Sequence, residues 1–191
     1  MATDESDVTK WIHAALAGDP AAEEQLTEHL HESLRGQAKM LLSERGSVRP
    51  TELVNEVWIR VFRGSAQPDI QDRNAFLAYM ARAMRSVIVD HSRQQSTQKR
   101  GGNMTRHPLD DFVQSVESLT QVDVLSLNEA LEDLRKENEQ LFRTVELRFF
   151  VGMTVKQVAE YLGISESAAG DAWALARAKL RAKLGASFER E

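Results

Sequence analysis

Arginine side chains dominate the residues that could do chemistry in the middle of this chain. Between Arg73 and Arg106 there are seven basic residues and one acid, Asp90. Arginines on an exposed helix face bind phosphate groups and stack on bases, and Tyr79 lies in the same segment. The segment therefore suits contact with a nucleic-acid strand. The alternative, which this segment alone slightly favours, is a solvated face on which arginine stems cover apolar surface.

The charge of the chain is unevenly distributed. The net charge is −5 at pH 7, which by itself argues against a nucleic-acid binder. However, residues 101–147 carry ten acids and four bases, and residues 173–185 carry four bases and no acid. The negative total is thus the average of a basic helix, an acidic middle and a basic last helix. It fits a protein that binds free DNA poorly.

The sequence offers little support for catalysis. It contains no cysteine, which excludes disulfides, thiol catalysis and cysteine-ligated metals. It also lacks the glycine-rich and nucleophile motifs that bind phosphates or activate a serine. The five histidines show no metal-ligand spacing with carboxylates; they are His13, His29, His31, His91 and His107. We therefore predict a protein that is not an enzyme, with no catalytic residue, no metal site and no cofactor.

Helical periodicity accounts for most of the chain, and strand-like alternation is almost absent. Asp19 followed by Pro20 is typical of a helix start. Three apolar stripes then follow at helical spacing: Leu26, Leu30, Leu34, Ala38 and Leu41; Leu53, Val54, Val57, Trp58, Val61 and Phe62; and Phe76, Met80, Met84 and Val87. The sequence therefore predicts an all-α protein.

We expect two small helical domains joined by a flexible linker. The domains span residues 8–95 and 126–186, because residues 96–125 contain glycines and a proline but few large apolar side chains. A capping-box pattern at Ser126 and Glu129 would open the second domain. The first residues form no apolar leader and no segment reaches the ~20 apolar residues of a membrane span, so we expect a cytoplasmic protein.

The most specific pattern lies near the end of the chain. Residues Thr154–Leu162 fit a short helix, Gly163 fits a left-handed turn, and Ser165 fits the N-cap of a last helix. Ile164 would fill the corner between the two helices. A DNA-binding helix-turn-helix is built in this way. The spacing favours it modestly over an ordinary helical hairpin.

Several runs of residues resemble the extracytoplasmic-function (ECF) group of bacterial RNA polymerase sigma factors. Residues Thr51–Phe62 (TELVNEVWIRVF) resemble region 2.2 of that family. Residues Arg73–Ala81 (RNAFLAYMA) and Met84–Arg93 (MRSVIVDHSR) resemble regions 2.3 and 2.4. Residues Val145–Phe150 (VELRFF), followed by Leu162–Ser165 (LGIS), resemble region 4. The resemblance covers nearly the whole chain, and the MRSVIVDHSR and VELRFF runs are its most specific parts.

The resemblance implies a sigma-2 domain followed by a sigma-4 domain, with core RNA polymerase and promoter DNA as partners. The Thr51–Arg63 helix would bind the clamp helices of the β′ subunit, whereas periodicity alone allows a simple core helix. Sigma-4 would bind the β flap. An anti-sigma factor is a further partner that the resemblance leaves open. The residues expected to bind the polymerase are Glu52, Asn55, Glu56 and Arg60.

The resemblance also implies two DNA sites. The first would hold the −10 element, with bases flipped from the non-template strand, through Arg73, Asn74, Tyr79, Arg82, Arg85, Ser86 and Arg93. The second would place the last helix in the major groove at the −35 element, through Ser165, Ser167, Ala168, Asp171 and Arg177.

The last helix departs from the family pattern. Family members commonly carry Thr, Lys or Arg early in this helix, whereas residues 167–172 read SAAGDA. Asp171 would repel phosphate, and Gly170 weakens a helix by roughly 1 kcal/mol relative to alanine. Few side chains here can read base edges. We therefore predict weak −35 recognition, with more reliance on the −10 element or on a partner.

The leading prediction is an ECF-type sigma factor that binds core RNA polymerase, recognises and melts promoter DNA, and directs initiation. Two alternatives stay open. A helix-turn-helix regulator that binds duplex DNA without polymerase would explain residues 154–184 but not the region 2 resemblance. A module that sequesters polymerase without initiating would explain the altered last helix.

Overall fold

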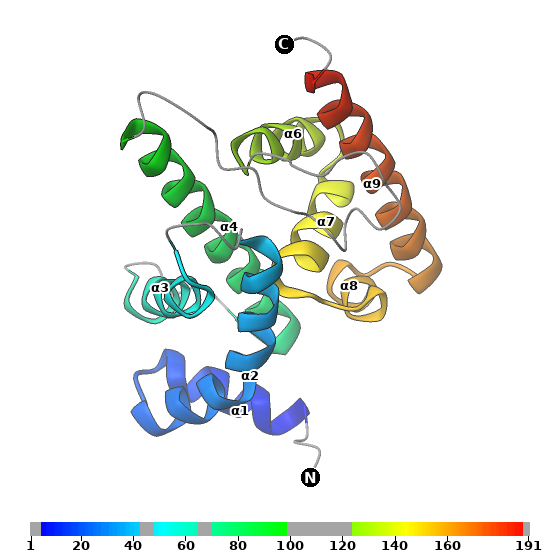
Figure 1. Cartoon of the computed structure of the whole chain (residues 1–191). Coiled ribbons are helices and arrows are strands. Elements are labelled where there is room, and N and C mark those ends of the chain that lie inside the picture. Colours follow the sequence, from blue (N-terminus) through cyan, green and yellow to red (C-terminus); the bar gives the residue numbers. More distant parts are fainter. Residues whose placement is uncertain (1–4, 43–47, 65–69, 99–123, 189–191) are drawn as a thin grey trace.

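The computed structural model describes residues 5–42, 48–64, 70–98 and 124–188, and the regular structure within these ranges is α-helical. Its helices are α1 (Glu5–Leu16), α2 (Pro20–Leu41), α3 (Pro50–Arg63), α4 (Arg73–Gln98), α6 (Val124–Glu137), α7 (Glu139–Val151), α8 (Val155–Leu162) and α9 (Glu166–Phe188) (Figure 1). The prediction of an all-α protein is confirmed. Most of the predicted linker, 99–123, and the loop centre, 65–69, lie outside the described residues.

The described helices form a first half, α1 to α4, and a second half, α6 to α9. Side-chain caps define where the helices of the first half begin. The Asp19 carboxylate accepts a hydrogen bond from the backbone N–H of Ala21 at 2.9 Å, and Pro20 is the first residue of α2, as predicted. At the start of α3 the Glu52 carboxylate accepts a 2.9 Å hydrogen bond from the Arg49 N–H. The predicted apolar stripes of α2, α3 and α4 all face the core, and within them only Phe62 is half-buried.

Helix α4 is buried on two sides, although its sequence stripe indicated one. On the first side, Phe76 packs against Trp58 of α3, with ring centroids 6.2 Å apart. On the second side, Ile88 and Val89 meet α6 and α7 and line a small apolar pocket together with Phe150. The second side is built from residues between the predicted stripe positions, so periodicity alone assigned them no partner.

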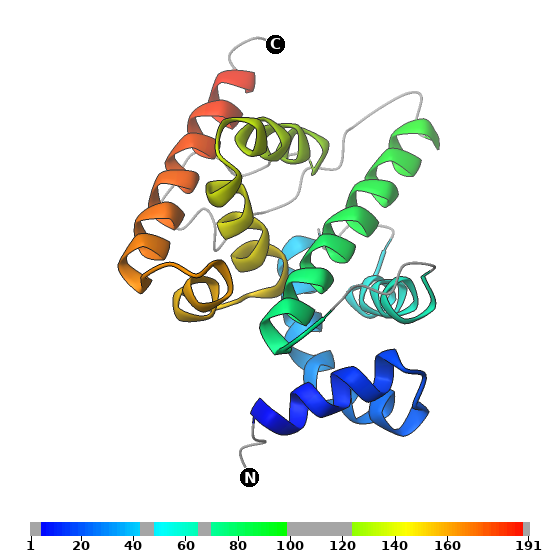
Figure 2. The same cartoon turned by 180° about the vertical axis from the view of Figure 1, so that it is seen from behind.

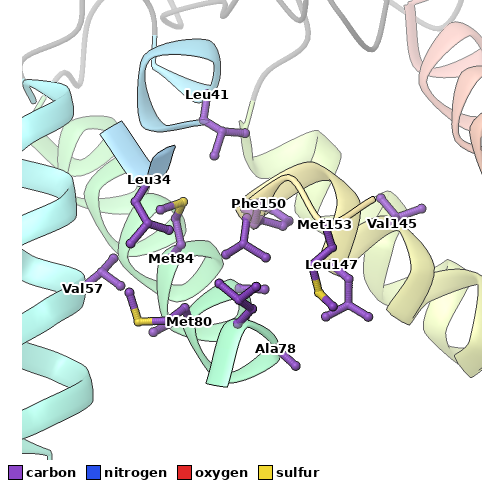
Figure 3. Packing of buried hydrophobic residues seen from close by; sticks show 14 of the residues in the cluster. Leu34, Leu41, Val57, Ala78, Met80, Met84, Val145, Leu147, Phe150 and Met153 are labelled. Carbon is purple, nitrogen blue, oxygen red and sulfur yellow. The ribbon is translucent and has the colours of Figure 1, made fainter. Parts of the chain in front are cut away.

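The two predicted helical domains share one hydrophobic core. Helix α7 packs against both α4 and α2, and α6 packs against α4. In Figure 3, Val57 of α3 approaches α4 from one side, and Phe150 and Leu147 of α7 lie on the other. Helix α7 and the N-terminal half of α4 lie side by side both in the front view and in the view from behind (Figures 1 and 2).

A glycine turn ends α7 at a point where α7 lies close to α2. Gly152 ends α7 in the left-handed region, with φ of 71°. A Cβ atom at this position would clash with the Gln37 side chain of α2. The left-handed backbone angle favours glycine at this position, and any other residue would also displace the amide end of the Gln37 side chain.

The sequence predicted the starts of three helices in the second half, and two of them, those of α8 and α9, are confirmed. Thr154 and Gln157 form the predicted capping box of α8, and Ser165 accepts a 3.1 Å hydrogen bond from the Ala168 N–H at the start of α9. The predicted start of α6 is wrong, because the helix begins at Val124 and Ser126 lies inside it. Val124 is buried in the core, and this packing extends the helix beyond the capping pattern.

We expect Leu131→Ala to destabilise the whole chain, because Leu131 is fully buried where α6 meets α4. Such a truncation costs about 2–5 kcal/mol in a close-packed core. Urea unfolding followed by circular dichroism measures the loss. Leu175→Ala is the matched control, since Leu175 is 51% exposed and its truncation changes the unfolding free energy by less than about 0.5 kcal/mol. Equal losses in the two variants would contradict this description of the core.

Candidate functional site

The outer face of α3 combines polar residues with one exposed apolar side chain. Glu52 and Asn55 are exposed, and Ile59 lies on the same helix face. Ile59 is 57% exposed, the most of any large apolar side chain within the described ranges. Isolated exposed apolar residues are common, but this one is surrounded by residues predicted to bind a partner. The face has the composition of a docking surface.

The other two residues predicted to bind the polymerase face α4. Glu56 contacts His91, with Oε2 2.6 Å from Nε2. Arg60 donates to Ser86 Oγ at 2.7 Å and to Asp90 at 3.1 Å. These contacts hold α3 and α4 together, so Glu56 and Arg60 position the docking surface as well as bordering it.

The residues predicted for the −10 element follow α4 but do not share one exposed face. Arg82, Ser86 and Arg93 are exposed. Residues Arg73, Asn74, Tyr79 and Arg85 are half-buried. The structure therefore brings part of the predicted set to the surface and places the rest next to other helices.

Arg85 lies where α4 meets α6 and α7. Its Nη1 atom donates to Glu132 at 2.9 Å and to Asn128 at 3.2 Å, and its Nε atom lies 3.2 Å from Glu146 Oε1. The guanidinium also stacks on the Phe142 ring, 5.0 Å from its centroid. We call the group Arg85, Asn128, Glu132 and Glu146 the Arg85 cluster. Only 18% of the Arg85 side chain is exposed.

The two carboxylates of the Arg85 cluster have different surroundings. Glu146 is 3% exposed, and burial raises the pKa of its carboxyl above the ordinary range although Arg85 attracts the charged form. Its Oε1 atom accepts no hydrogen bond from the described residues. Glu132 lies at the rim, where partial burial opposes the charged form but contacts with Arg85 and Arg135 outweigh it and lower the pKa.

Helices α8 and α9 are joined by a turn in which Gly163 takes the predicted left-handed conformation, with φ of 66°. Ile164 packs against the core in the corner of the turn. The residues predicted for the −35 element share one half of α9. Ser165, Ser167 and Asp171 are exposed, while Ala168 and Arg177 are half-buried.

Two arginines lie against one tryptophan of α9. The guanidinium carbons of Arg148 and Arg177 are 4.9 and 5.4 Å from the centroid of the Trp173 ring. Burial and then the charge of Arg177 lower the pKa of Arg148. Arg148 donates to the Met153 carbonyl at 3.2 Å, and its buried Nε atom has no partner among the described residues. The pair is a concentrated positive charge that suits an anion.

Sequence reasoning missed three residues of these surfaces. Ile59 could have been found, because it is an apolar residue outside the α3 stripe. Trp173 is half-buried and lies against the two arginines, one of which comes from another helix. Arg148 comes from α7, and no local pattern connects it to Trp173 on α9.

A family model described as ECF sigma factor matches residues 5–186. The chain belongs to the ECF sigma factor family. Membership implies a role in transcription initiation, with RNA polymerase and promoter DNA as partners. A comparison with curated proteins found no match.

The family is a non-enzymatic family of transcription factors. In the part of this sigma factor that the structure describes, no group of three or more His, Asp or Glu side chains could hold a metal ion. No helix among the same residues is long and apolar enough to cross a membrane.

In this sigma factor a carboxylate of α6 binds two lysines of α9. Glu137 accepts hydrogen bonds from Lys179 at 2.9 Å and lies 2.8 Å from Lys183. Hydrogen bonds from Lys183 and Lys179 lower the pKa of Glu137 to about 2. The contact fixes the C-terminal half of α9, which carries the late basic residues, against α6.

We expect Glu137→Gln to lower the thermal unfolding midpoint at neutral pH. The pKa of Glu137 lies below its unfolded value of 4.5. Its contribution is therefore fully present above pH 4.5 and is lost as the pH falls toward about 2. The difference between wild type and variant should shrink over that range. Glu129→Gln, an exposed position on the same helix, is the control. A difference that stays constant with pH would contradict the assignment.

Proposed function

We propose that this ECF sigma factor binds core RNA polymerase through the outer face of α3 and directs promoter-specific initiation. The observation that carries the proposal is the exposed Ile59 among Glu52 and Asn55, on a helix held directly against the basic helix α4. An apolar residue within a polar rim is the usual composition of an interface hot spot. Because α3 packs against α4, the polymerase and the −10 element would be bound by adjacent helices.

The −10 element would be bound and melted by α4. Arg82 and Arg93 are exposed and suit phosphate, and Tyr79 offers an aromatic ring for a base. A protein that binds single strands better than duplex shifts the melting equilibrium without performing any covalent chemistry. Region 2 would act in this way.

The −35 element would be bound by α8 and α9 acting as a helix-turn-helix. The left-handed turn at Gly163 and the cap at Ser165 support that assignment. The Arg148–Trp173–Arg177 stack would hold a phosphate of the DNA backbone. Asp171, exposed near the start of α9, opposes DNA binding, so the contact would position the DNA more than select its sequence.

The same altered helix favours a second candidate, a module that sequesters polymerase without initiating. The early residues of α9 are small or acidic, so base-specific contacts are few. Such a protein would keep the α3 docking surface and lose promoter selection. The two candidates differ in one outcome, which is transcription from a defined start site.

We expect purified protein and core RNA polymerase to co-elute and to produce run-off transcripts with defined 5′ ends from fragmented genomic DNA. Sequencing those 5′ ends measures promoter selection directly. Co-elution without defined transcripts would instead support the sequestering module. Binding to duplex DNA in the absence of polymerase, with no co-elution, would support an independent helix-turn-helix regulator.

One pair of variants in this assay tests the docking surface. Ile59→Ser should weaken core polymerase binding by roughly tenfold or more, as expected when a hot-spot side chain is truncated. Met40→Ser, which removes another exposed apolar side chain on α2, should leave the affinity unchanged. Equal effects of the two substitutions would contradict the assignment of α3 as the docking surface.

A further inference from the structure

Helix α1 is tied to the start of α4, although the two helices are far apart in the sequence. His13 of α1 lies with its Nε2 atom 2.9 Å from the Ile70 carbonyl oxygen, just before α4. The two helices pack against each other, and Figure 2 shows the start of α4 beside α1. Because a carbonyl oxygen can only accept, the Nε2–H group of His13 is the donor.

The hydrogen bond of His13 is not part of the packing that holds α1 in place. Val8, Ile12 and Ala15 bury one face of α1 in the core. His13 lies outside this apolar stripe and is exposed. Its contact with the Ile70 carbonyl is therefore a separate link, made from the edge of α1 to the residues that lead into α4.

The segment Ile70–Asp72 determines where α4 begins. The Ile70 side chain is buried in the core. The Asp72 carboxylate accepts a 2.7 Å hydrogen bond from the Ala75 N–H, and the Asp72 carbonyl accepts one from the Phe76 N–H at 3.0 Å. These bonds pair the backbone groups that a helix start leaves open. A shift of this segment would therefore move the first turn of α4.

The first turn of α4 carries Arg73 and Asn74, two of the residues proposed to bind the −10 element. The Asn74 side chain is held only weakly by its neighbours among the described residues. Its Nδ2 atom makes a long 3.4 Å contact with Glu160, and its buried Oδ1 atom accepts no hydrogen bond from these residues. The direction of this side chain therefore depends on the backbone that precedes it.

We propose that His13 is a positioning residue for recognition of the −10 element. Its hydrogen bond to the Ile70 carbonyl holds the start of α4 against α1 and so sets the direction of Arg73 and Asn74. His13 itself touches no DNA. The DNA part of this proposal rests on the proposed function, whereas the anchoring of α4 is a property of the free protein.

The size of the effect follows from the strength of one hydrogen bond. A typical net contribution shifts an equilibrium by roughly fivefold. This is too small to unfold the chain but large enough to change how often the first turn of α4 occupies the position that binds DNA. We therefore expect weaker DNA binding with unchanged helix content and unchanged binding to core polymerase through α3.

Two substitutions at the same position separate the donor from the bulk of the side chain. His13→Leu removes the N–H donor and keeps an apolar group of similar size, whereas His13→Gln keeps an N–H donor. Leucine and glutamine both favour a helix at least as well as histidine, so neither weakens α1. The control is Lys10→Leu, which places leucine at another exposed position of α1.

Amide hydrogen exchange in the free protein tests the anchor without DNA or polymerase. We expect the Ala75 and Phe76 amides to exchange roughly fivefold faster in H13L than in H13Q, K10L and the parent protein. The Ala21 amide, which the Asp19 carboxylate caps at the start of α2, is the internal reference and should not change. Equal exchange in all four proteins would overturn the proposal.

Binding of promoter DNA tests the role in recognition. The probe is a labelled single strand of non-template DNA that covers the −10 region of a start site mapped by the run-off assay. We expect polymerase carrying H13L to bind it roughly fivefold more weakly than polymerase carrying H13Q or the parent, with equal affinity of all three proteins for core polymerase.

The other outcomes separate this proposal from the proposed function. Faster exchange in H13L with unchanged DNA binding would overturn the role of His13 in recognition, and so would an equal loss of polymerase binding. A parent protein that gives no defined start sites would overturn the proposed function and the DNA role of His13 together. Amide exchange would still decide whether His13 anchors α4.

Discussion

The apolar packing of α6 and α7 against α4 is the interaction on which the arrangement of the described helices depends. It connects the residues resembling region 2 to those resembling region 4. Arg85 lies in the same contact, and Glu132 and Glu146 supply the charge partners that its largely buried guanidinium requires. The apolar contacts of Phe150 and Ile88 then complete the core.

The contact between α4 and the second half also explains why basic and acidic residues are separated along the sequence. Helix α4 of the basic stretch packs against α6 and α7, which carry the described part of the acidic stretch. Part of the negative charge lies against the helix proposed to meet DNA, which accounts physically for a net charge of −5 in a member of a DNA-binding family.

Local signals predicted much of the fold because they depend on neighbours in the sequence. Asp19, Thr154 and Ser165 cap the helices they were expected to cap, and Gly163 adopts the expected turn. Residues that take their partners from distant helices were not predictable in this way. Arg85 was assigned to an exposed face because nothing near it in sequence indicates that Glu146 would reach it. The predicted start of α6 was wrong for the same reason, because long-range packing of Val124 outweighs the capping pattern at Ser126.

The central claim is that this ECF sigma factor binds core RNA polymerase through the outer face of α3, at the exposed Ile59. The most direct measurement places a photoreactive side chain at position 59 and, in a second protein, at the exposed position 40, and then adds core RNA polymerase. We predict cross-links to the polymerase from position 59 and none from position 40. Cross-links from position 40 alone would contradict the claim, because α3 would then not be the docking surface.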